Sequence, residues 1–295
     1  MIEEFVKQIV LPQRDSHKGE NGRVLVIGGS RLFHAASFWS ACMASKIVDM
    51  VHFSSPVIEN NELMRVRAKA KFWEGIVVSW EEVEHYIRED DAILIGPGMV
   101  RSNINPKSEI LNPKQTLPAG RQVRNSKSEI LNENTRIIVN SLLKKYPEKR
   151  WVVDGGALQE VNPSLLKQNM IITPNKRERE ILLHHYTIES LHHLGVTVFA
   201  KGRVDVISDG TRRIEIPGGS SGMTKGGTGD VLAGLVVGLY AKSPAMASCA
   251  VASQVNKRAG EQLEKKLGPF FSASDLIGEA QVVLGEMFDT HCKYW

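Results

Sequence analysis

Short apolar runs recur along this chain, and small or turn-forming residues follow them. The runs at 24–27 and 92–95 contain only apolar side chains, and the sequences GGS and GPG close them. Segments with helical composition, such as 35–50 and 80–88, lie between the runs. Strands that are buried on both faces and alternate with helices form parallel sheets covered by helices on both sides. We therefore expect an α/β fold, a three-layer α/β/α sandwich with a mostly parallel central sheet.

The same patterns locate the other elements. Further strands are expected at 51–54, 75–79, 151–153, 170–173, 196–201, 204–208 and 212–216, and further helices at 136–146 and 244–265. Asp209-Gly210 between the last two strands predicts a tight hairpin turn. Ligands of parallel α/β sheets bind beyond the carboxyl ends of the strands, so we look for the site in the loops that follow them.

Residues 101–135 differ in composition from the rest of the chain. The segment is polar and contains proline, and the sequence KSEILN begins at Lys107 and again at Lys127. Residues 101–150 hold eleven Lys and Arg against four Asp and Glu, whereas the remainder holds 26 against 29. We expect one domain over 1–295 with a basic surface insertion at about 101–135. The insertion has no aromatic residue to stack on bases, so no nucleic-acid partner is expected.

Several classes of protein are excluded by composition. The three cysteines are far apart and odd in number, which disfavours a disulfide framework and a cysteine-based zinc site. The histidine pairs at 184–185 and 192–193 lack the i, i+4 spacing of a helical zinc site, so no residue is predicted as a metal ligand. No apolar run is long enough to span a bilayer, and the first residues do not form a signal peptide. A cytoplasmic protein without a membrane partner is expected.

The stretch from Gly218 to Gly238 carries the strongest functional signal. Six of the twelve residues from Gly218 to Gly229 are glycine, and Asp230 and a small apolar run follow. Glycines let backbone amides approach a ligand, and a helix that begins there directs unpaired N–H groups and its positive dipole end at the ligand. This pattern predicts an anion site, most often for phosphate. Asp230 fits either as a helix cap or as a general base beside the phosphate.

Two common phosphate-binding fingerprints are absent. The Walker pattern requires Lys after its glycines, but Lys225 precedes Gly226. The Rossmann pattern requires three spaced glycines directly after a strand, and neither the GGS nor the GPG loop supplies the third glycine.

The sequence GGTGD at 226–230 resembles the signature of the ribokinase-like superfamily. Within it, the chain most resembles the ADP/ATP-dependent NAD(P)H-hydrate dehydratase family. The supporting segments are HKGENGRVLVIGGSR at 17–31, IGPGM at 95–99, KG at 201–202 and ASDL at 273–276. The resemblance covers about residues 15–280 without the insertion.

Three segments depart from the family pattern. The chain has LFHAA at 32–36 in place of GYTGA, so that only Ala36 matches. It has TPNKRE at 173–178 in place of TPHPGE, which puts Asn175 in the position of a histidine. It has DGGAL at 154–158 in place of DADAL. The first two departures concern the side of the site that the resemblance assigns to the substrate.

The resemblance implies repair of hydrated NADH and NADPH, the metabolites NADHX and NADPHX. A nucleotide would phosphorylate the hydroxyl of the hydrated nicotinamide ring, and phosphate would then leave to restore the double bond. The activity is that of a hydro-lyase with ADP or ATP as phosphoryl donor and Mg²⁺ as the cation that bridges the phosphates.

The resemblance also assigns residues to roles. Asp230 is the expected base, and the amides of Gly227 and Gly229 are the expected donors to the transferred phosphoryl group. The residues expected at the nucleotide are Lys201, Gly202, Arg203, Val204, Asp205, Gly226 and Gly229. The residues expected at the substrate are Ala36, Gly98, Asn175 and Asp230.

Partners and alternatives follow from the same comparison. An oligomer of identical chains is expected, and the chain leaves no room for the epimerase domain often fused in this family, so a separate NAD(P)H-hydrate epimerase is the expected pathway partner. The first alternative is a ribokinase-like kinase for a small alcohol of the hydroxymethylpyrimidine or thiazole type. The second is a non-catalytic nucleotide-binding protein on a degraded site.

Overall fold

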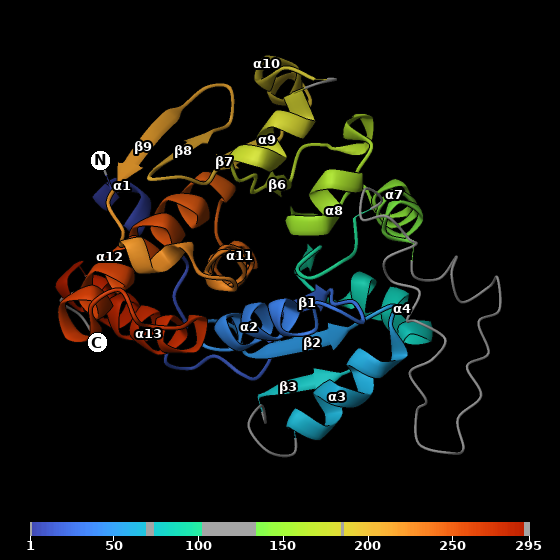
Figure 1. The fold of residues 1–295 in the computed structure, drawn as a ribbon, viewed down its shortest axis with the longest axis horizontal. Coiled ribbons are helices and arrows are strands. Elements are labelled where there is room, and N and C mark those ends of the chain that lie inside the picture. Colours follow the sequence, from blue (N-terminus) through green and yellow to red (C-terminus); the bar gives the residue numbers. More distant parts are fainter. Residues whose placement is uncertain (1, 69–73, 102–133, 184–185, 292–295) are drawn as a thin grey trace, which may run out of the picture.

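The computed structural model describes residues 2–68, 74–101, 134–183 and 186–291 (Figure 1). Its strands form one nine-stranded sheet with the order β3-β2-β1-β4-β5-β6-β7-β8-β9. All neighbours are parallel from β3 to β7, whereas β7-β8 and β8-β9 are antiparallel. The predicted hairpin at Asp209-Gly210 therefore closes one edge of a parallel sheet.

The strand bounds follow the predicted apolar runs closely. The strands are β1 Arg23–Ile27, β2 Met50–Ser54, β3 Gly75–Val77, β4 Ala92–Ile95, β5 Arg150–Val153, β6 Met170–Ile172, β7 Thr197–Ala200, β8 Val204–Ser208 and β9 Arg213–Pro217. The α-helices are α1 Ile2–Val6, α2 Ala35–Ala44, α3 Ile58–Ala68, α4 Val83–Glu89, α7 Thr135–Lys145, α8 Gly155–Glu160, α9 Lys176–Leu183, α10 Ile188–His193, α11 Thr228–Tyr240, α12 Ala245–Leu267 and α13 Ala273–His291. Short 3₁₀ turns occur at Trp80–Glu82, Pro163–Leu165 and Ser221–Thr224.

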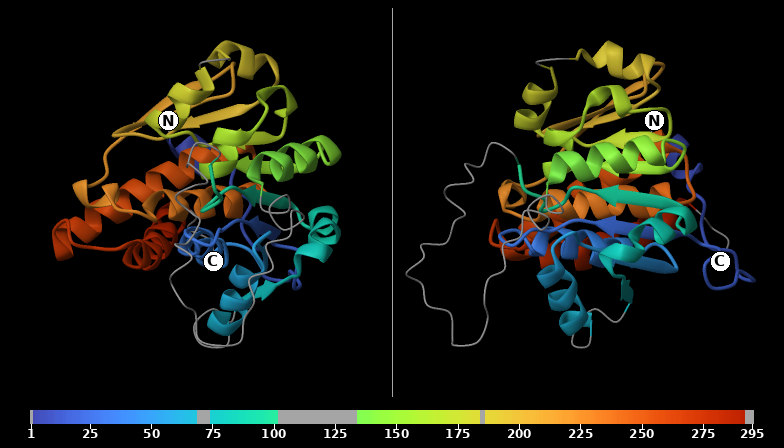
Figure 2. Two further views of the ribbon diagram at one scale, coloured as in Figure 1. Left: turned by 45° about the vertical axis from the view of Figure 1, so that its right-hand side comes forward. Right: turned by 90° about the vertical axis from the view of Figure 1, so that its right-hand side faces the viewer.

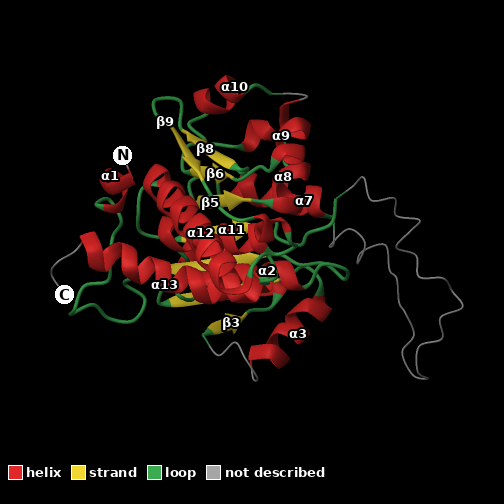
Figure 3. Cartoon of the chain, turned by 60° about the vertical axis from the view of Figure 1, so that its left-hand side comes forward, coloured by secondary structure: helices red, strands yellow, loops and turns green. Residues whose placement is uncertain are grey.

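Two hydrophobic cores lie on the two faces of the sheet. Helices α1, α2, α11, α12 and α13 bury one face, and α4, α7, α8, α9 and α10 bury the other. Figure 2 shows these layers from two sides, and Figure 3 shows α11, α12 and α13 together on one side of the yellow strands. Alternate residues of β1 divide between the cores, with Val24 and Val26 in the first and Leu25 and Ile27 in the second. The predicted three-layer α/β/α sandwich is confirmed.

Helix α11 lies at the centre of the first core and positions its own first turn. Every residue of α11 except Gly229 and Asp230 is buried. Helix α2 approaches α11 so closely that a Cβ on Gly234 would lie 2.5 Å from the carbonyl oxygen of Ser40. Only glycine permits this contact, which fixes α11 along its length and leaves the end at Asp230 open to a ligand.

Two predicted elements differ from the observed ones. The helix expected at 35–50 ends at Ala44, because turns follow and the chain must reverse to place Met50 beside Arg23 in the sheet. The strand expected at 75–79 ends at Val77. The expected insertion lies outside the described residues, apart from Arg101 and residues 134–135. In the described parts of the chain, no helix combines the length and apolarity that crossing a membrane requires.

Candidate active site

The glycine-rich loop leads directly into the first turn of α11. Gly227 is the N-cap residue and has φ of 96°, a left-handed conformation that favours glycine. A Cβ on Gly226 would meet no atom within 4 Å, and one on Gly229 would meet only the Lys201 Nζ at 3.8 Å. The space that a side chain would occupy at these two glycines is therefore open. This arrangement can bind an anion, as the sequence predicts.

A buried lysine of α12 joins the glycine-rich loop to the segment after β7. The Lys257 ammonium donates hydrogen bonds to the carbonyl oxygens of Gly202, Arg203 and Gly218, at 3.0–3.2 Å. It also lies 3.6 Å from the Asp205 carboxylate. Lys257 thus holds together the two backbone segments that were predicted to contact a nucleotide.

Asp205 faces the protein rather than open space. Its carboxylate accepts hydrogen bonds from the Gly202 amide at 2.8 Å and the Ser253 hydroxyl at 2.7 Å. Burial raises the pKa of Asp205, although these donors and Lys257 oppose the effect. Arg203 and Val204 have exposed side chains on the same loop. The segment can therefore offer backbone groups and the Arg203 side chain to a nucleotide, while the Asp205 carboxylate shapes the loop.

Asp230 lies beside an ion pair at the carboxyl ends of β5 and β7. The Lys201 ammonium is 2.5 Å from Oδ1 of Asp154, and the Thr173 hydroxyl donates to the same oxygen at 2.6 Å. Asp154 and Thr173 are buried, and the Lys201 side chain is 14% exposed. Three adjacent strand ends thus contribute one residue each to a compact charged group next to the start of α11.

This charged group controls the protonation of Asp230. Burial raises the pKa of Asp230 first, and repulsion by Asp154 and Glu178 raises it further, while Lys201 lowers it. The result is a pKa of about 7. Burial alone would lower the pKa of Lys201, but the carboxylates of Asp154 and Glu178 raise it overall, so the lysine stays charged. A carboxylate with a pKa near neutrality can accept a proton in catalysis.

Glu178 and Asn175 form the start of α9 at the edge of this group. The backbone N–H of Asn175 donates to Oε2 of Glu178, and the backbone N–H of Glu178 donates to Oδ1 of Asn175, both at 3.0 Å. This reciprocal cap fixes both residues. Burial raises the pKa of Glu178, and Lys201 opposes the effect. Asn175, predicted to contact the substrate, is exposed, and its side-chain oxygen caps the helix.

Ala36 and Gly98, also predicted to contact the substrate, lie together near α11. A Cβ on Gly98 would be 3.2 Å from the Cβ of Ala36 and 2.2 Å from the carbonyl oxygen of Phe33. One turn after Ala36, the Ser40 hydroxyl donates to the backbone carbonyl of Asp230 at 2.8 Å. The loops after β1 and β4 therefore meet the first turn of α2, and α2 in turn holds the first turn of α11.

The predicted site residues do not include Asp154, Glu178 or Lys257. Asn175 and Glu178 have the spacing of a capping box, so the role of Glu178 could have been found. Asp154 and Lys201 lie 47 positions apart, and only the sheet order brings them together. Lys257 gave no signal, since a lysine in a long helix is normally exposed.

A mostly parallel sheet, a glycine-rich helix start that can bind an anion and a carboxylate with a pKa of about 7 are typical of α/β proteins that bind nucleotides. A family model described as NAD(P)H-hydrate dehydratase matches residues 24–281, which is most of the chain. The chain therefore belongs to the NAD(P)H-hydrate dehydratase family. The family predicted from the sequence is confirmed.

Individual relatives agree with this assignment. The ADP-dependent (S)-NAD(P)H-hydrate dehydratase of Nitrosopumilus maritimus is 31% identical over 298 residues, covering 95% of this chain and 94% of that protein. The bifunctional NAD(P)H-hydrate repair enzyme Nnr of Methanocaldococcus jannaschii is 30% identical over 286 residues, covering 93% of this chain. The match covers 50% of that relative, so the chain spans about half the length of the bifunctional enzyme.

A solved structure shows the same fold. The ADP/ATP-dependent NAD(P)H-hydrate dehydratase of Bacillus subtilis, co-crystallised with ATP and Mg²⁺, superposes with a TM-score of 0.67 over 97% of each chain. Its sequence is 18% identical to this chain, so the likeness concerns the fold.

Proposed function

We propose that this chain dehydrates hydrated NADH and NADPH in a nucleotide-dependent reaction, with Asp230 as the general base. The observation that carries the proposal is the placement of Asp230. Its carboxylate lies in the first turn of α11, where unpaired amides can bind an anion, and burial raises its pKa to about 7. Family membership supports the substrate, because the relatives are named for NAD(P)H-hydrate.

In the first step, the Asp230 carboxylate removes the proton from the ring hydroxyl of the hydrate. The hydroxyl oxygen attacks the terminal phosphorus of ADP or ATP, and the bond from that phosphorus to the remaining nucleotide breaks. The backbone amides at Gly227 and Gly229 would donate to the phosphoryl oxygens as charge moves onto them. The Lys201 ammonium next to Gly229 adds a positive charge at the same place.

In the second step, the phosphate leaves the ring carbon to which it was transferred. A proton leaves the neighbouring ring carbon, and the electron pair of that C–H bond forms the restored double bond. Phosphate is a much better leaving group than hydroxide, which is the chemical reason to couple dehydration to a nucleotide. The net reaction converts the hydrate and one phosphoryl donor into reduced nicotinamide, phosphate, the shortened nucleotide and one proton.

The residues present fit a Mg²⁺–nucleotide complex bound through phosphate. Among residues 2–68, 74–101, 134–183 and 186–291, no group of three or more His, Cys, Asp or Glu side chains could hold a metal ion. A Mg²⁺ ion that enters with the nucleotide would be held mainly by phosphate oxygens and water. When bound, Mg²⁺ supplies charge neutralisation on the phosphates.

We assign the two halves of the site to the two ligands. The nucleotide is proposed to lie along the loop of residues 201–205 and at Gly226 and Gly229, where open backbone is held by Lys257. The hydrate is proposed to lie at Ala36, Gly98 and Asn175, facing Asp230. The observed meeting of Ala36 with Gly98 supports a common surface for this ligand.

The cellular setting is part of the proposal. A relative is named for the (S) form of the hydrate, so an enzyme that converts the other epimer, an NAD(P)H-hydrate epimerase, is the proposed pathway partner. We also propose that the chain is cytoplasmic, because reduced nicotinamide cofactors are used in the cytoplasm. A homo-oligomeric state is proposed as well.

The assay of this proposal uses hydrated NADH, the purified chain and Mg²⁺, with ADP and ATP in parallel reactions. Recovery of the reduced-nicotinamide absorbance in step with release of free phosphate is expected, and the more active nucleotide is the donor. Nucleotide binding without any recovery would contradict the proposal and favour a small-alcohol kinase or a non-catalytic binder.

A further inference from the structure

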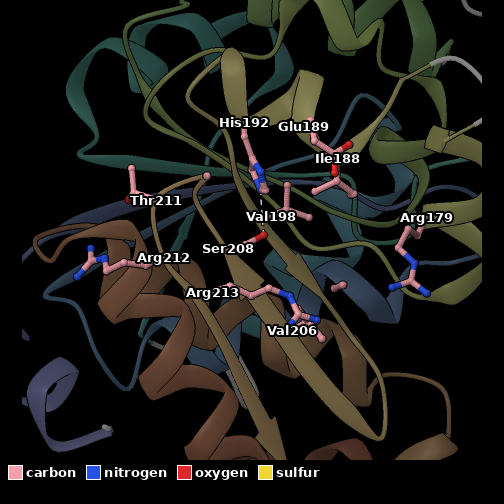
Figure 4. Close-up of a pocket in the computed structure, with 12 residues that line it drawn as sticks. Arg179, Ile188, Glu189, His192, Val198, Val206, Ser208, Thr211, Arg212 and Arg213 are labelled. Atoms are coloured by element: carbon pink, nitrogen blue, oxygen red, sulfur yellow. Dashed lines mark hydrogen bonds between the residues drawn. The ribbon is translucent and has the colours of Figure 1, made fainter.

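A cavity of about 380 Å³ lies on the face of β7–β9 that is opposite α12 (Figure 4). Its floor is formed by Val198, Ala200 and Val206, because β7 and β8 pair Ala200 with Val206 and direct both to the same face. The intervening residues Phe199 and Ile207 belong to the core on the other face. None of the residues assigned above to catalysis, nucleotide or substrate lines this cavity.

Two arginines line the same cavity from different elements. Arg179 extends from α9 and Arg213 from β9, and Figure 4 shows the Arg213 guanidinium beside Val206 and that of Arg179 to the right of it. Arg213 has Glu215 at 2.6 Å, whereas the Arg179 side chain has no ion pair in the described part of the chain. The Arg213–Glu215 pair is more than half exposed on the arginine side, so a stronger acceptor can replace Glu215 at little cost.

Arg212 also lines the cavity but is directed elsewhere. Its guanidinium is 3.7 Å from the Asp209 carboxylate and lies 5.6 Å from the centre of the Phe5 ring. In Figure 4 it points away from Arg179 and Arg213. The positive charge available to a ligand is therefore that of Arg179 and Arg213.

The other end of the floor carries a hydrogen-bonded polar pair. The Nε2 atom of His192 is 2.9 Å from the Ser208 hydroxyl. The hairpin turn packs against this histidine so closely that a Cβ on Gly210 would be 2.8 Å from the His192 Cβ. Among the described residues that line the cavity, Glu189 is the one acid, and it lies on α10 beside His192 rather than between the arginines. An anionic group would therefore be placed at the arginine end and a polar edge at the histidine end.

We propose that this cavity binds a phosphorylated aromatic small molecule of nucleoside monophosphate size, separately from the site at Asp230. The volume suits a ligand of that size. An aromatic ring can lie on the apolar floor, its polar edge can contact His192 or Ser208, and its phosphate can accept paired hydrogen bonds from the two guanidiniums. Arg179 follows Glu178 in α9 and Ala200 precedes Lys201, so the ligand would contact the same segments that surround Asp230.

The test uses methyl NMR of the full chain, because the two sites contain different reporters. Valines 198 and 206 report on the cavity, and Val231 next to Asp230 reports on the nucleotide site. AMP, ribose 5-phosphate and inorganic phosphate are titrated separately to distinguish base, sugar and phosphate recognition. We expect saturable shifts of both cavity valines with AMP and weaker responses with the other two.

Variants connect the shifts to the arginines. R179Q/R213Q should weaken AMP binding reported by Val198 and Val206 by about tenfold or more, because charge-assisted hydrogen bonds are lost. The control R258Q, on α12, should leave AMP binding at these valines unchanged. If the double variant unfolds, the single variant R179Q is used to test the same loss of AMP binding. Shifts confined to Val231, or equal affinity at the cavity valines in wild type and R179Q/R213Q, would overturn the proposal whether or not the chain is a dehydratase.

Discussion

The two halves of the candidate site are built differently. The half that we propose binds the nucleotide is called the phosphate half. In it, Lys257 hydrogen-bonds to both the glycine-rich loop and the segment of residues 201–205. The carboxylates of Asp154 and Glu178 beside Asp230 are buried and hydrogen-bonded. In the substrate half, Leu32 and Phe33 expose 58% and 46% of their surface and Asn175 is exposed. The phosphate half matches the family signature, whereas the substrate half departs from it at residues 32–35 and 175.

This difference has a physical reason. Phosphoryl transfer requires open amides, a base and fixed charges in one geometry, and displacement of any of them is costly. Exposed side chains that only contact the substrate ring can be substituted with a smaller loss of activity. The comparison predicts that substitutions in the phosphate half abolish turnover or folding, and that substitutions in the substrate half alter substrate affinity.

The largest effect is expected for Asp230→Asn. The amide cannot accept the hydroxyl proton, so kcat should fall by about a thousandfold or more, while ADP affinity stays within about twofold. Initial rates of hydrated NADH repair and calorimetry with ADP measure the two quantities. Asp15→Asn, at an exposed carboxylate, is the control. Equal loss of binding and turnover would identify Asp230 as a structural cap instead.

The next effect concerns the lysine that joins the two backbone segments. Lys257→Met leaves the buried Asp205 carboxylate and three carbonyl oxygens without their cation, which should cost about 3 kcal/mol of stability. ADP affinity should fall by about a hundredfold as the loops separate. Urea unfolding and ADP calorimetry are the measurements.

Two further variants test the role of Lys257. Lys265→Met, at an exposed position of the same helix, should change neither the stability nor the ADP affinity. The double variant Lys257→Met/Asp205→Leu should regain stability but not ADP affinity, because it removes the unpaired charge without restoring the loop contacts. Normal ADP affinity in Lys257→Met would show that the loops hold their positions without it.

A smaller effect is expected in the pH dependence. Since the base must be ionised and its pKa is about 7, kcat/KM should rise with pH through about 7. Asp154 raises the pKa of Asp230, so Asp154→Asn should move this rise to lower pH. Lys201 lowers that pKa, so Lys201→Met should move the rise in the opposite direction. A rise at the same pH in all three proteins would remove Asp230 as the titrating group.

Most of the fold was predictable because strands buried on both faces are short apolar runs, and β4 was located to the residue. The helix expected at 35–50 was too long, because β1 and β2 pairing, a tertiary contact, decides where the turn begins. In the site, GGTGD revealed the anion loop and Asp230 since both are contiguous. The contacts of Asp154 with Lys201 and of Lys257 with two loop segments depend on sheet order and helix packing, which no local pattern records.

The smallest effect is expected for Phe33→Ala, and it tests the difference between the two halves most directly. The Phe33 carbonyl contacts Gly98 and its ring is partly exposed, so Phe33→Ala should remove a ring contact without moving Asp230. Loss of one such contact should raise KM for hydrated NADH by about fivefold and leave kcat and the KM for the nucleotide unchanged. Phe270→Ala, at a phenylalanine that is 85% exposed, is the matched control and should change none of these. If Phe33→Ala instead lowered kcat with KM unchanged, residue 33 would help to position the reacting groups, and the division between a fixed phosphate half and a variable substrate half would be wrong at this loop.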